Sequence, residues 1–206
     1  MDQEKIVYFG FDECVGSSMD SHIVIAMTVS RNIEEVRNGS PSEKQRAITK
    51  DLLSQEFLYA HIDKKREERR AKVMHKATEE LIHQGINRFC NDDEVIGLYF
   101  DGNDGLIQKM ESLQNHPQYN FREVNFIPQG DKKIALIWKA DNLANTLYHY
   151  HSTSPRSIER IQRARSIYPK LDERIAQAKI YFPQTLNRKR PSSYYERILI
   201  SLQSLS

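Results

Sequence analysis

Four acidic residues stand at the ends of separate apolar segments, a placement that is typical of carboxylates that bind divalent metal. Asp12 and Glu13 follow one apolar run, Asp101 follows another, and Asp141 opens a region with helical periodicity. An acid next to a buried strand costs free energy unless a cation or a hydrogen-bond donor accompanies it. Carboxylate oxygens are hard ligands that suit Mg²⁺ and Mn²⁺. The sequence therefore predicts a metal site built from these four residues.

Two of the apolar segments are predicted to be neighbouring parallel strands. Residues 6–11 and 95–100 are rich in β-branched and aromatic side chains, as expected for buried strands. Because alternate side chains of a strand share one face, Asp12 and Asp101 would then meet at the carboxyl edge of the sheet. Ligand sites in open α/β sheets favour that edge. A glycine within each segment leaves room for the close approach of a backbone or a ligand.

The rest of residues 1–151 reads as an α/β domain. Residues 22–29 follow a turn-like segment and predict an antiparallel hairpin with the first strand. Helices and strands alternate after the hairpin, and a right-handed crossover joins the last two strands. Further elements are expected as strands at 57–62 and 121–127 and as helices at 43–53, 64–89 and 104–115 and from Asp141 onward.

The helix predicted at Asp141 carries small and polar side chains on one face. Asp141, Ala144, Asn145 and Tyr148 share this face at helical spacing. Small residues there let the helix pack closely against the sheet, which would bring Asp141 to the acids at the strand ends. The alternative is that Asp141 is an ordinary acid in the first turn of a helix, where the helix dipole favours it.

Composition indicates one sizeable core with an appendage. The chain has 206 residues, of which 39% are hydrophobic, and we expect a domain over 1–151 and a basic helical extension over 152–206. No apolar run of about 18 residues and no apolar leader is visible, so a cytoplasmic protein without a membrane span is expected. Cys14 and Cys90 are too few for a disulfide framework or a zinc cluster. Cys14 is read as an incidental thiol, with a redox or nucleophilic role as the alternative.

Charge is distributed unevenly along the chain. Residues 1–151 hold 19 basic and 24 acidic side chains, a balance of −5, whereas 152–206 hold 11 and 4, a balance of +7. A basic extension beside an acidic site suits an enzyme that acts on a polyanion such as nucleic acid. Solvated helix surfaces, or an extension that docks a protein partner, are the alternatives. The candidate nucleic-acid contacts are Arg156, Arg160, Arg163, Arg188, Lys189 and Arg190.

Histidines offer a competing kind of metal site. His149 and His151 flank a tyrosine, but a helix would point them apart, and no third ligand accompanies them in the sequence. His61 and Asp63 are interpreted as one solvated face of a strand. His149 and His151 are therefore assigned to the surface or the core.

The order of the predicted elements resembles the ribonuclease H-like fold of two-metal nucleases. Three antiparallel strands, a helix, a strand ending in Asp, a helix, a strand and a helix beginning with Asp follow one another. Phe11-Asp12-Glu13 followed by Gly16 resembles the opening shared by type 2 ribonucleases H and the domain-of-unknown-function 3800 family. The segment 139–144 is similar to the Ala-Asp-Leu-hydrophobic-Ala helix start of the latter family. The resemblance covers about residues 5–151.

This resemblance implies a mixed five-stranded sheet flanked by helices and metal-binding roles for Asp12, Asp101 and Asp141, with Glu13 as a fourth carboxylate. It implies a nuclease that uses Mg²⁺ or Mn²⁺ to hydrolyse phosphodiesters. Type 2 ribonucleases H place Gly-Arg-Gly after the acidic pair to read a ribose hydroxyl, whereas this chain has Cys-Val-Gly. The alternative function is that of a non-catalytic relative that binds nucleic acid or a protein.

Overall fold

The computed structural model describes residues 5–16, 22–37, 55–62, 70–102, 119 and 121–181. The helices predicted at 43–53 and 104–115 lie outside the described residues, as does the basic segment formed by Arg188, Lys189 and Arg190. No helix in the described ranges is long and apolar enough to cross a membrane.

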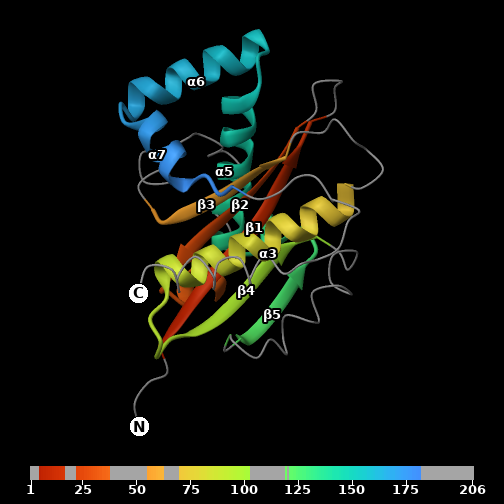
Figure 1. Cartoon of the computed structure of the whole chain (residues 1–206), viewed down its shortest axis with the longest axis vertical. Helices are drawn as coiled ribbons and strands as arrows, with labels where there is room; N and C mark the ends of the chain where they lie inside the picture. The colour runs from red at the N-terminus through yellow and green to blue at the C-terminus, as the bar shows by residue number, and fades with distance from the viewer. Residues whose placement is uncertain are drawn as a thin grey trace, which may run out of the picture.

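A mixed sheet of five strands forms the middle of the molecule (Figure 1). The strand order is β3-β2-β1-β4-β5, so β1 is central. Its pairing with β2, and that of β2 with β3, is antiparallel, whereas β1 with β4 and β4 with β5 are parallel. The strands are β1 (Ile6–Val15), β2 (Ile23–Ser30), β3 (Phe57–Ile62), β4 (Val95–Asp101) and β5 (Phe121–Ile127).

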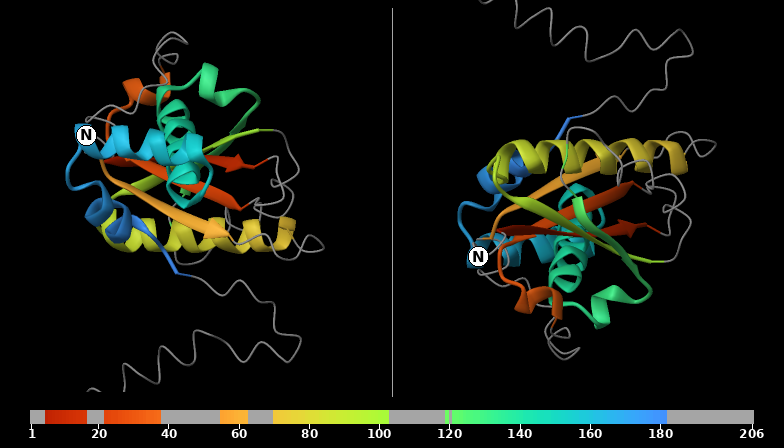
Figure 2. Two further views of the ribbon diagram at one scale, coloured as in Figure 1. Left: turned by 90° about the horizontal axis from the view of Figure 1, so that it is seen from above. Right: turned by 90° about the horizontal axis from the view of Figure 1, so that it is seen from below.

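Helices cover both faces of the sheet. Figure 2 shows α3 on one face and α5 on the other, with α6 beside α5. The helix α7 packs at the β3 edge. The helical elements are α1 (Glu34–Arg37), α3 (Arg70–Phe89), η2 (Gly130–Lys132), α5 (Ala135–His151), α6 (Pro155–Ile167) and α7 (Leu171–Ala178).

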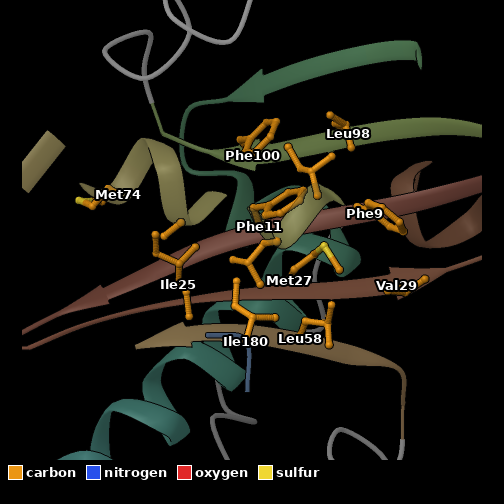
Figure 3. Packing of buried hydrophobic residues seen from close by; sticks show 14 of the residues in the cluster. Phe9, Phe11, Ile25, Met27, Val29, Leu58, Met74, Leu98, Phe100 and Ile180 are labelled. Carbon is orange, nitrogen blue, oxygen red and sulfur yellow. The ribbon is translucent and has the colours of Figure 1, made fainter. Parts of the chain in front are cut away.

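The larger core lies between the sheet and α3 (Figure 3). Odd-numbered residues of β1 and β2 point into it, among them Phe9, Phe11 and Met27, as the alternation of a strand requires. The predicted apolar stripe of α3 faces the same core, with Leu81 and Ile82 fully buried. The stripe predicted for residues 64–89 is thus confirmed over the residues that the structure describes.

A second core on the opposite face joins α5, α6 and α7 to the sheet. Val24 and Tyr59 from the strands belong to the same buried cluster as Leu147 of α5, Ile161 of α6 and Ile175 of α7. The beginning of the basic extension is therefore packed into the protein rather than appended to it. The predicted division at residues 151 and 152 coincides with the end of α5 and stays a prediction.

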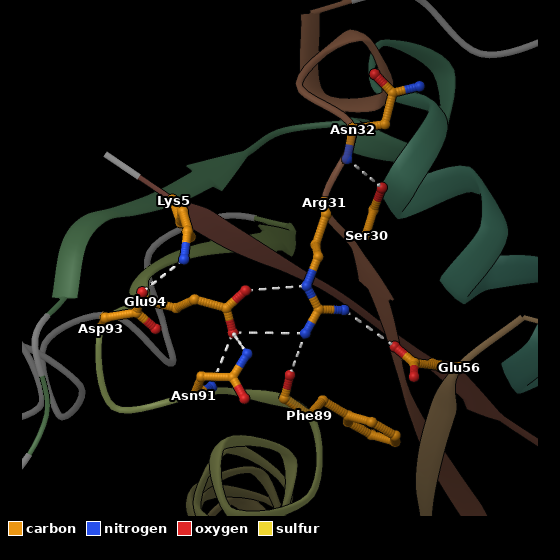
Figure 4. Close-up of polar contacts among 9 residues, drawn as sticks. All are labelled: Lys5, Ser30, Arg31, Asn32, Glu56, Phe89, Asn91, Asp93 and Glu94. Atoms are coloured by element: carbon orange, nitrogen blue, oxygen red, sulfur yellow. Dashed lines mark hydrogen bonds and ion pairs between the residues drawn. The ribbon is translucent and has the colours of Figure 1, made fainter. Parts of the chain in front are cut away.

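A polar cluster fixes the end of the sheet opposite to the carboxyl end of β4 (Figure 4). Arg31, just after β2, donates to the buried carboxylate of Glu94 at 3.0 Å and to the carbonyl of Phe89. Glu94 also accepts from the backbone N–H of Asn91 at 2.8 Å. Arg31 lowers the pKa of Glu94 through its hydrogen bond. The cluster ties the end of α3 and the start of β4 to β2.

Two boundaries differ from the sequence prediction. The strand β1 continues to Val15, so Asp12 and Glu13 lie within it rather than after it, because β2 keeps pairing with β1 as far as Val15. The helix α5 begins at Ala135 rather than at Asp141. Burial of its first turn against the sheet outweighs the local signals, and Asp141 therefore lies in the second turn. It is not an acid of the first turn.

The helix α5 crosses β1 at very short range, and Gly10 makes this possible. A Cβ atom at Gly10 would lie 2.7 Å from Cγ of Leu136 and 2.9 Å from its backbone oxygen. Thr28 of β2 donates its hydroxyl to the same carbonyl at 3.0 Å. The Leu136 carbonyl has its hydrogen bond, and Gly10 beneath it has no side chain. The backbone of α5 can therefore pack directly against the sheet.

We expect Gly10→Ala to destabilise the protein by roughly 1–3 kcal/mol, because the backbone of Leu136 cannot move without shifting α5. Urea unfolding monitored by circular dichroism measures the change. Gly85→Ala in α3 is the control: its new methyl meets side-chain atoms alone, the flexible end of Met27 and the edge of the Phe9 ring, and no backbone, and alanine favours the helix. Equal losses in both variants would contradict the argument.

Candidate metal centre

Asp12 lies at the point where β1 loses one of its two neighbours. The last pair between β1 and β4 joins Phe11 to Phe100, whereas Asp12 still pairs with Ala26 of β2. Asp12 and Asp101 are the next residues on their two parallel strands, which brings both to the same edge, as predicted. The side that holds Asp12 also holds Gly10 and faces α5. Asp12 is only 8% exposed.

Backbone N–H groups hold one oxygen of each strand carboxylate. Glu13 donates its N–H to Oδ1 of Asp12 at 2.6 Å, and Gly130 donates its N–H to Oδ1 of Asp101 at 2.7 Å. Such hydrogen bonds fix the direction of metal-binding carboxylates in proteins. Gly130 belongs to η2, and the sequence offered no signal for it because the donor is a backbone group.

The electrostatic environment of Asp12 is dominated by burial and by other acids. Burial raises the pKa of Asp12 to about 9, with further upward contributions from the negative charges of Asp101, Asp141 and Glu13. The hydrogen bond from the N–H of Glu13 acts in the opposite direction. The charged groups that act most strongly on Asp12 are thus the three carboxylates that the sequence grouped with it.

The helix α5 supplies Asp141 and runs along β1 beyond it. Asn145 donates from Nδ2 to the sulfur of Cys14 at 3.8 Å, and the hydroxyl of Tyr148 occupies the space where a side chain at Gly16 would lie. The helical face predicted from Asp141 to Tyr148 therefore packs along the last residues of β1. Burial raises the pKa of the Cys14 thiol, and the nearby carboxylates add to this effect. A protonated thiol is a weak nucleophile.

The donor set suits a hard divalent cation, although the side chains are not arranged around one. Across the described ranges, no three His, Cys, Asp or Glu side chains form a group that could hold a metal ion as they stand. The gathered groups are all carboxylates, the oxygen ligands that Mg²⁺ and Mn²⁺ take. A cation would oppose both causes that keep the pKa of Asp12 high, the burial of its charged form and the negative charges around it.

The helix α6 carries arginines on two of its sides, and one of them acts electrostatically on the end of β1 that holds the acids. The positive charge of Arg160 lowers the pKa of Cys14, whereas the charges of Asp12 and Asp141 raise it. Arg160 and the two acids therefore act on the same thiol. Arg165 lies on the other side of α6, where it pairs with Asp172 of α7 at 2.9 Å. Helical spacing groups Arg156 and Arg163 with Arg160.

Comparison with known proteins identifies the fold. The structure is similar to the crystal structure of ribonuclease H2 from Pyrococcus horikoshii OT3, with a TM-score of 0.50 and 16% sequence identity over 97% of this chain and 100% of that chain. No protein-family model and no curated protein matches this chain. At this identity the similarity shows the fold alone. The protein has a ribonuclease H-like fold, and the fold class predicted from the sequence is confirmed.

We expect Asp12→Asn to stabilise the metal-free protein by roughly 1–3 kcal/mol at pH 8, because the wild type must take up a proton on Asp12 to bury it beside three acids, whereas an amide is neutral already. The pKa of Asp12 is raised from 3.8 to about 9, so the wild type loses stability as the pH rises through this window. The gain should therefore grow from pH 5 to pH 8 in thermal unfolding.

Asp172→Asn is the matched control for this experiment. Arg165 lowers the pKa of Asp172, so its amide variant should lose stability rather than gain it, and the loss should shrink in acid. An unfolding temperature of Asp12→Asn that stays equal to that of the wild type at every pH would contradict the proposed repulsion.

Proposed function

We propose that the protein is a metal-dependent nuclease that hydrolyses phosphodiester bonds at the edge formed by Asp12, Glu13, Asp101 and Asp141. The raised pKa of Asp12 is the observation that supports this most directly, because a nearly buried acid beside three others is expensive without a cation. Strongly shifted pKa values of this kind gather at functional sites. The fold is one that two-metal nucleases use.

The proposed roles follow from the positions of the side chains. Asp12, on the central strand, would hold the divalent ions together with Asp101 and Asp141, and Glu13 would supply a fourth carboxylate. Bound divalent ions would activate the attacking water and stabilise the leaving oxygen. The hydrogen bonds from Glu13 and Gly130 orient the carboxylates for this purpose.

We further propose that the substrate is not restricted to RNA paired with DNA. The chain has Cys-Val-Gly after the acidic pair, as noted above, and α5 occupies this region. Asn145 contacts Cys14, and Tyr148 lies against Gly16.

The α6 arginines are proposed to bind the phosphate backbone of the substrate. Arg156, Arg160 and Arg163 lie on the side of α6 away from α7, and Arg160 acts on the end of β1 that carries the acids. Arg163 pairs with Glu159 one turn away on α6, at 3.5 Å and with both side chains about three-quarters exposed. Such a pair is weak and gives way readily to a phosphate.

We expect Asp12→Asn to abolish saturable Mg²⁺ or Mn²⁺ binding in calorimetry and to reduce cleavage of labelled oligonucleotides at least about 100-fold. Asp101→Asn and Asp141→Asn should act in the same direction. Single-stranded, duplex and hybrid substrates are compared in parallel, with chelator as the metal-free reference.

Asp93→Asn is the control, because Asp93 is an exposed acid at the end of the sheet opposite to the proposed site. It forms an ion pair with Lys5, whose carbonyl accepts the N–H of Val95 at the start of β4. The variant should leave binding and cleavage unchanged. Tight oligonucleotide binding with no metal-dependent cleavage by the wild type would overturn the nuclease proposal and favour the non-catalytic relative.

We expect the triple variant Arg156→Ala, Arg160→Ala, Arg163→Ala to reduce the slope of log K against log salt by about 2–3, or about 0.7–0.9 for each lost phosphate contact. Fluorescence anisotropy with a labelled oligonucleotide measures the slope. Arg165→Ala, on the opposite side of α6, is the control. Point variants are needed because α6 and α7 contribute to the core, so deleting residues 152–206 would unfold the protein.

A further inference from the structure

Three histidines that are far apart in the sequence meet at the end of α5. His22 precedes β2, His61 lies on β3, and His151 is the last residue of α5. The rings of His61 and His151 are stacked, with centroids 4.0 Å apart and planes at 11°. The ring of His22 lies 5.1 Å from that of His61 and 6.2 Å from that of His151. The sequence had suggested a solvated strand face for His61, but the structure places His61 in this cluster instead. Its predicted companion Asp63 lies outside the described residues.

Hydroxyl and aromatic groups enclose this histidine cluster. Tyr59, which is fully buried, meets Nε2 of His151 through its hydroxyl at 3.2 Å. Tyr148 stacks on His22 with centroids 4.4 Å apart, and Nε2 of His22 lies 3.0 Å from the carbonyl oxygen of the same tyrosine. The hydrogen bond to the carbonyl requires a proton on Nε2 of His22.

The arrangement is suited to binding protons rather than a metal ion. Two imidazoles stacked face to face direct their nitrogen lone pairs into parallel planes, and these do not converge on one tetrahedral ion. No metal-holding group of His, Cys, Asp or Glu side chains is found in the described part of the chain. Histidine is also the side chain that changes its charge near neutral pH.

The surroundings disfavour positive charge on the cluster. Burial lowers the pKa of His151 to about 3, and His61, Lys179 and His22 act in the same direction. Burial also lowers the pKa of His149, together with Arg160 and Arg156 of α6. The titratable and charged groups around the cluster are Tyr59 from β3, Tyr148, His149 and Tyr150 from α5, Lys179 after α7, and Arg156 and Arg160 from α6.

We propose that His22, His61 and His151 form a proton-sensitive latch that holds the end of α5 against β3 at neutral pH and loosens when the imidazoles bind protons. Two positive rings at stacking distance repel each other, and Lys179 adds to the repulsion. This inference does not depend on the proposed nuclease activity.

The latch lies where it can control the position of α6. His151 is followed by only three residues before α6 begins, and Ser154 caps that helix by accepting the N–H of Ser157 at 3.2 Å. His149 bonds Ser157 through Nδ1 at 2.8 Å. Loosening of α5 at His151 would therefore be passed to α6 and to its exposed arginine side chains.

The direction of the pH effect follows from linkage. The pKa of His151 is lowered from 6.5 to about 3, so the latched state is fully favoured above about pH 6.5 and loses its advantage as the pH falls. For one histidine with these values, the equilibrium between latched and loosened states shifts about eightfold toward loosening between pH 7.0 and 5.5.

The test is hydrogen exchange at pH 7.0 and 5.5, corrected for intrinsic rates, combined with NMR titration of the histidine side chains in the wild type. We expect protection over residues 149–167 to fall about eightfold or more in acid, while α3 keeps its protection. His61→Gln and His151→Gln should each remove most of this loss of protection, because an amide cannot become charged. In His151→Gln the amide can still form the hydrogen bond with the Tyr59 hydroxyl.

His75→Gln is the matched control, because His75 lies on α3 and pairs with Glu79; its exchange profile should equal that of the wild type. The proposal is overturned if His61 and His151 both titrate at the ordinary value near 6.5, or if α6 stays equally protected at both pH values. Acid sensitivity that survives in both glutamine variants would also overturn it. The titration uses only the wild type, so a variant that fails to fold does not prevent a decision.

Discussion

The direct contact of α5 with the central strand is the constraint on which the rest of the structure depends. Gly10 has no side chain, and Thr28 satisfies the Leu136 carbonyl that rests above it. The helix backbone can therefore lie at a distance that an alanine at residue 10 would prevent. This distance places Asp141 close enough to Asp12 for their charges to interact. The acidic site is thus a consequence of helix packing as much as of strand order.

The same contact concentrates unfavourable charge. Asp12 is nearly buried and lies among three other carboxylates, an arrangement that lowers stability without a cation. Proteins retain such arrangements where function requires them, and the surrounding structure compensates for the lost stability. Here the two cores on either face of the sheet, together with the Arg31 and Glu94 cluster at its other end, hold the strands in place.

Strand periodicity was sufficient to predict the acids of the sheet, but it did not predict the boundaries or the contacts between distant elements. The shared sheet edge of Asp12 and Asp101 was predicted because β-branched and aromatic runs define buried strands locally, although β1 continues past Asp12. The start of α5 was predicted six residues late, since burial of residues 135–140 against the sheet is a tertiary effect. The N–H of Gly130 carries no sequence signal. The cluster of His22, His61 and His151 was not predicted, because its members come from three separate elements that only the folded sheet brings together.

The two clusters along α5 respond to pH in opposite directions, and this limits the range in which the metal-free protein is most stable. The raised pKa of Asp12 means that stability is lost as the pH rises above about 4, whereas the lowered pKa of His151 means that stability is lost as the pH falls below about 6.5. Both groups act on the same helix, one in its second turn and one at its end. A cation bound by the carboxylates removes the first loss and leaves the second, so the occupied protein would be sensitive to acid alone.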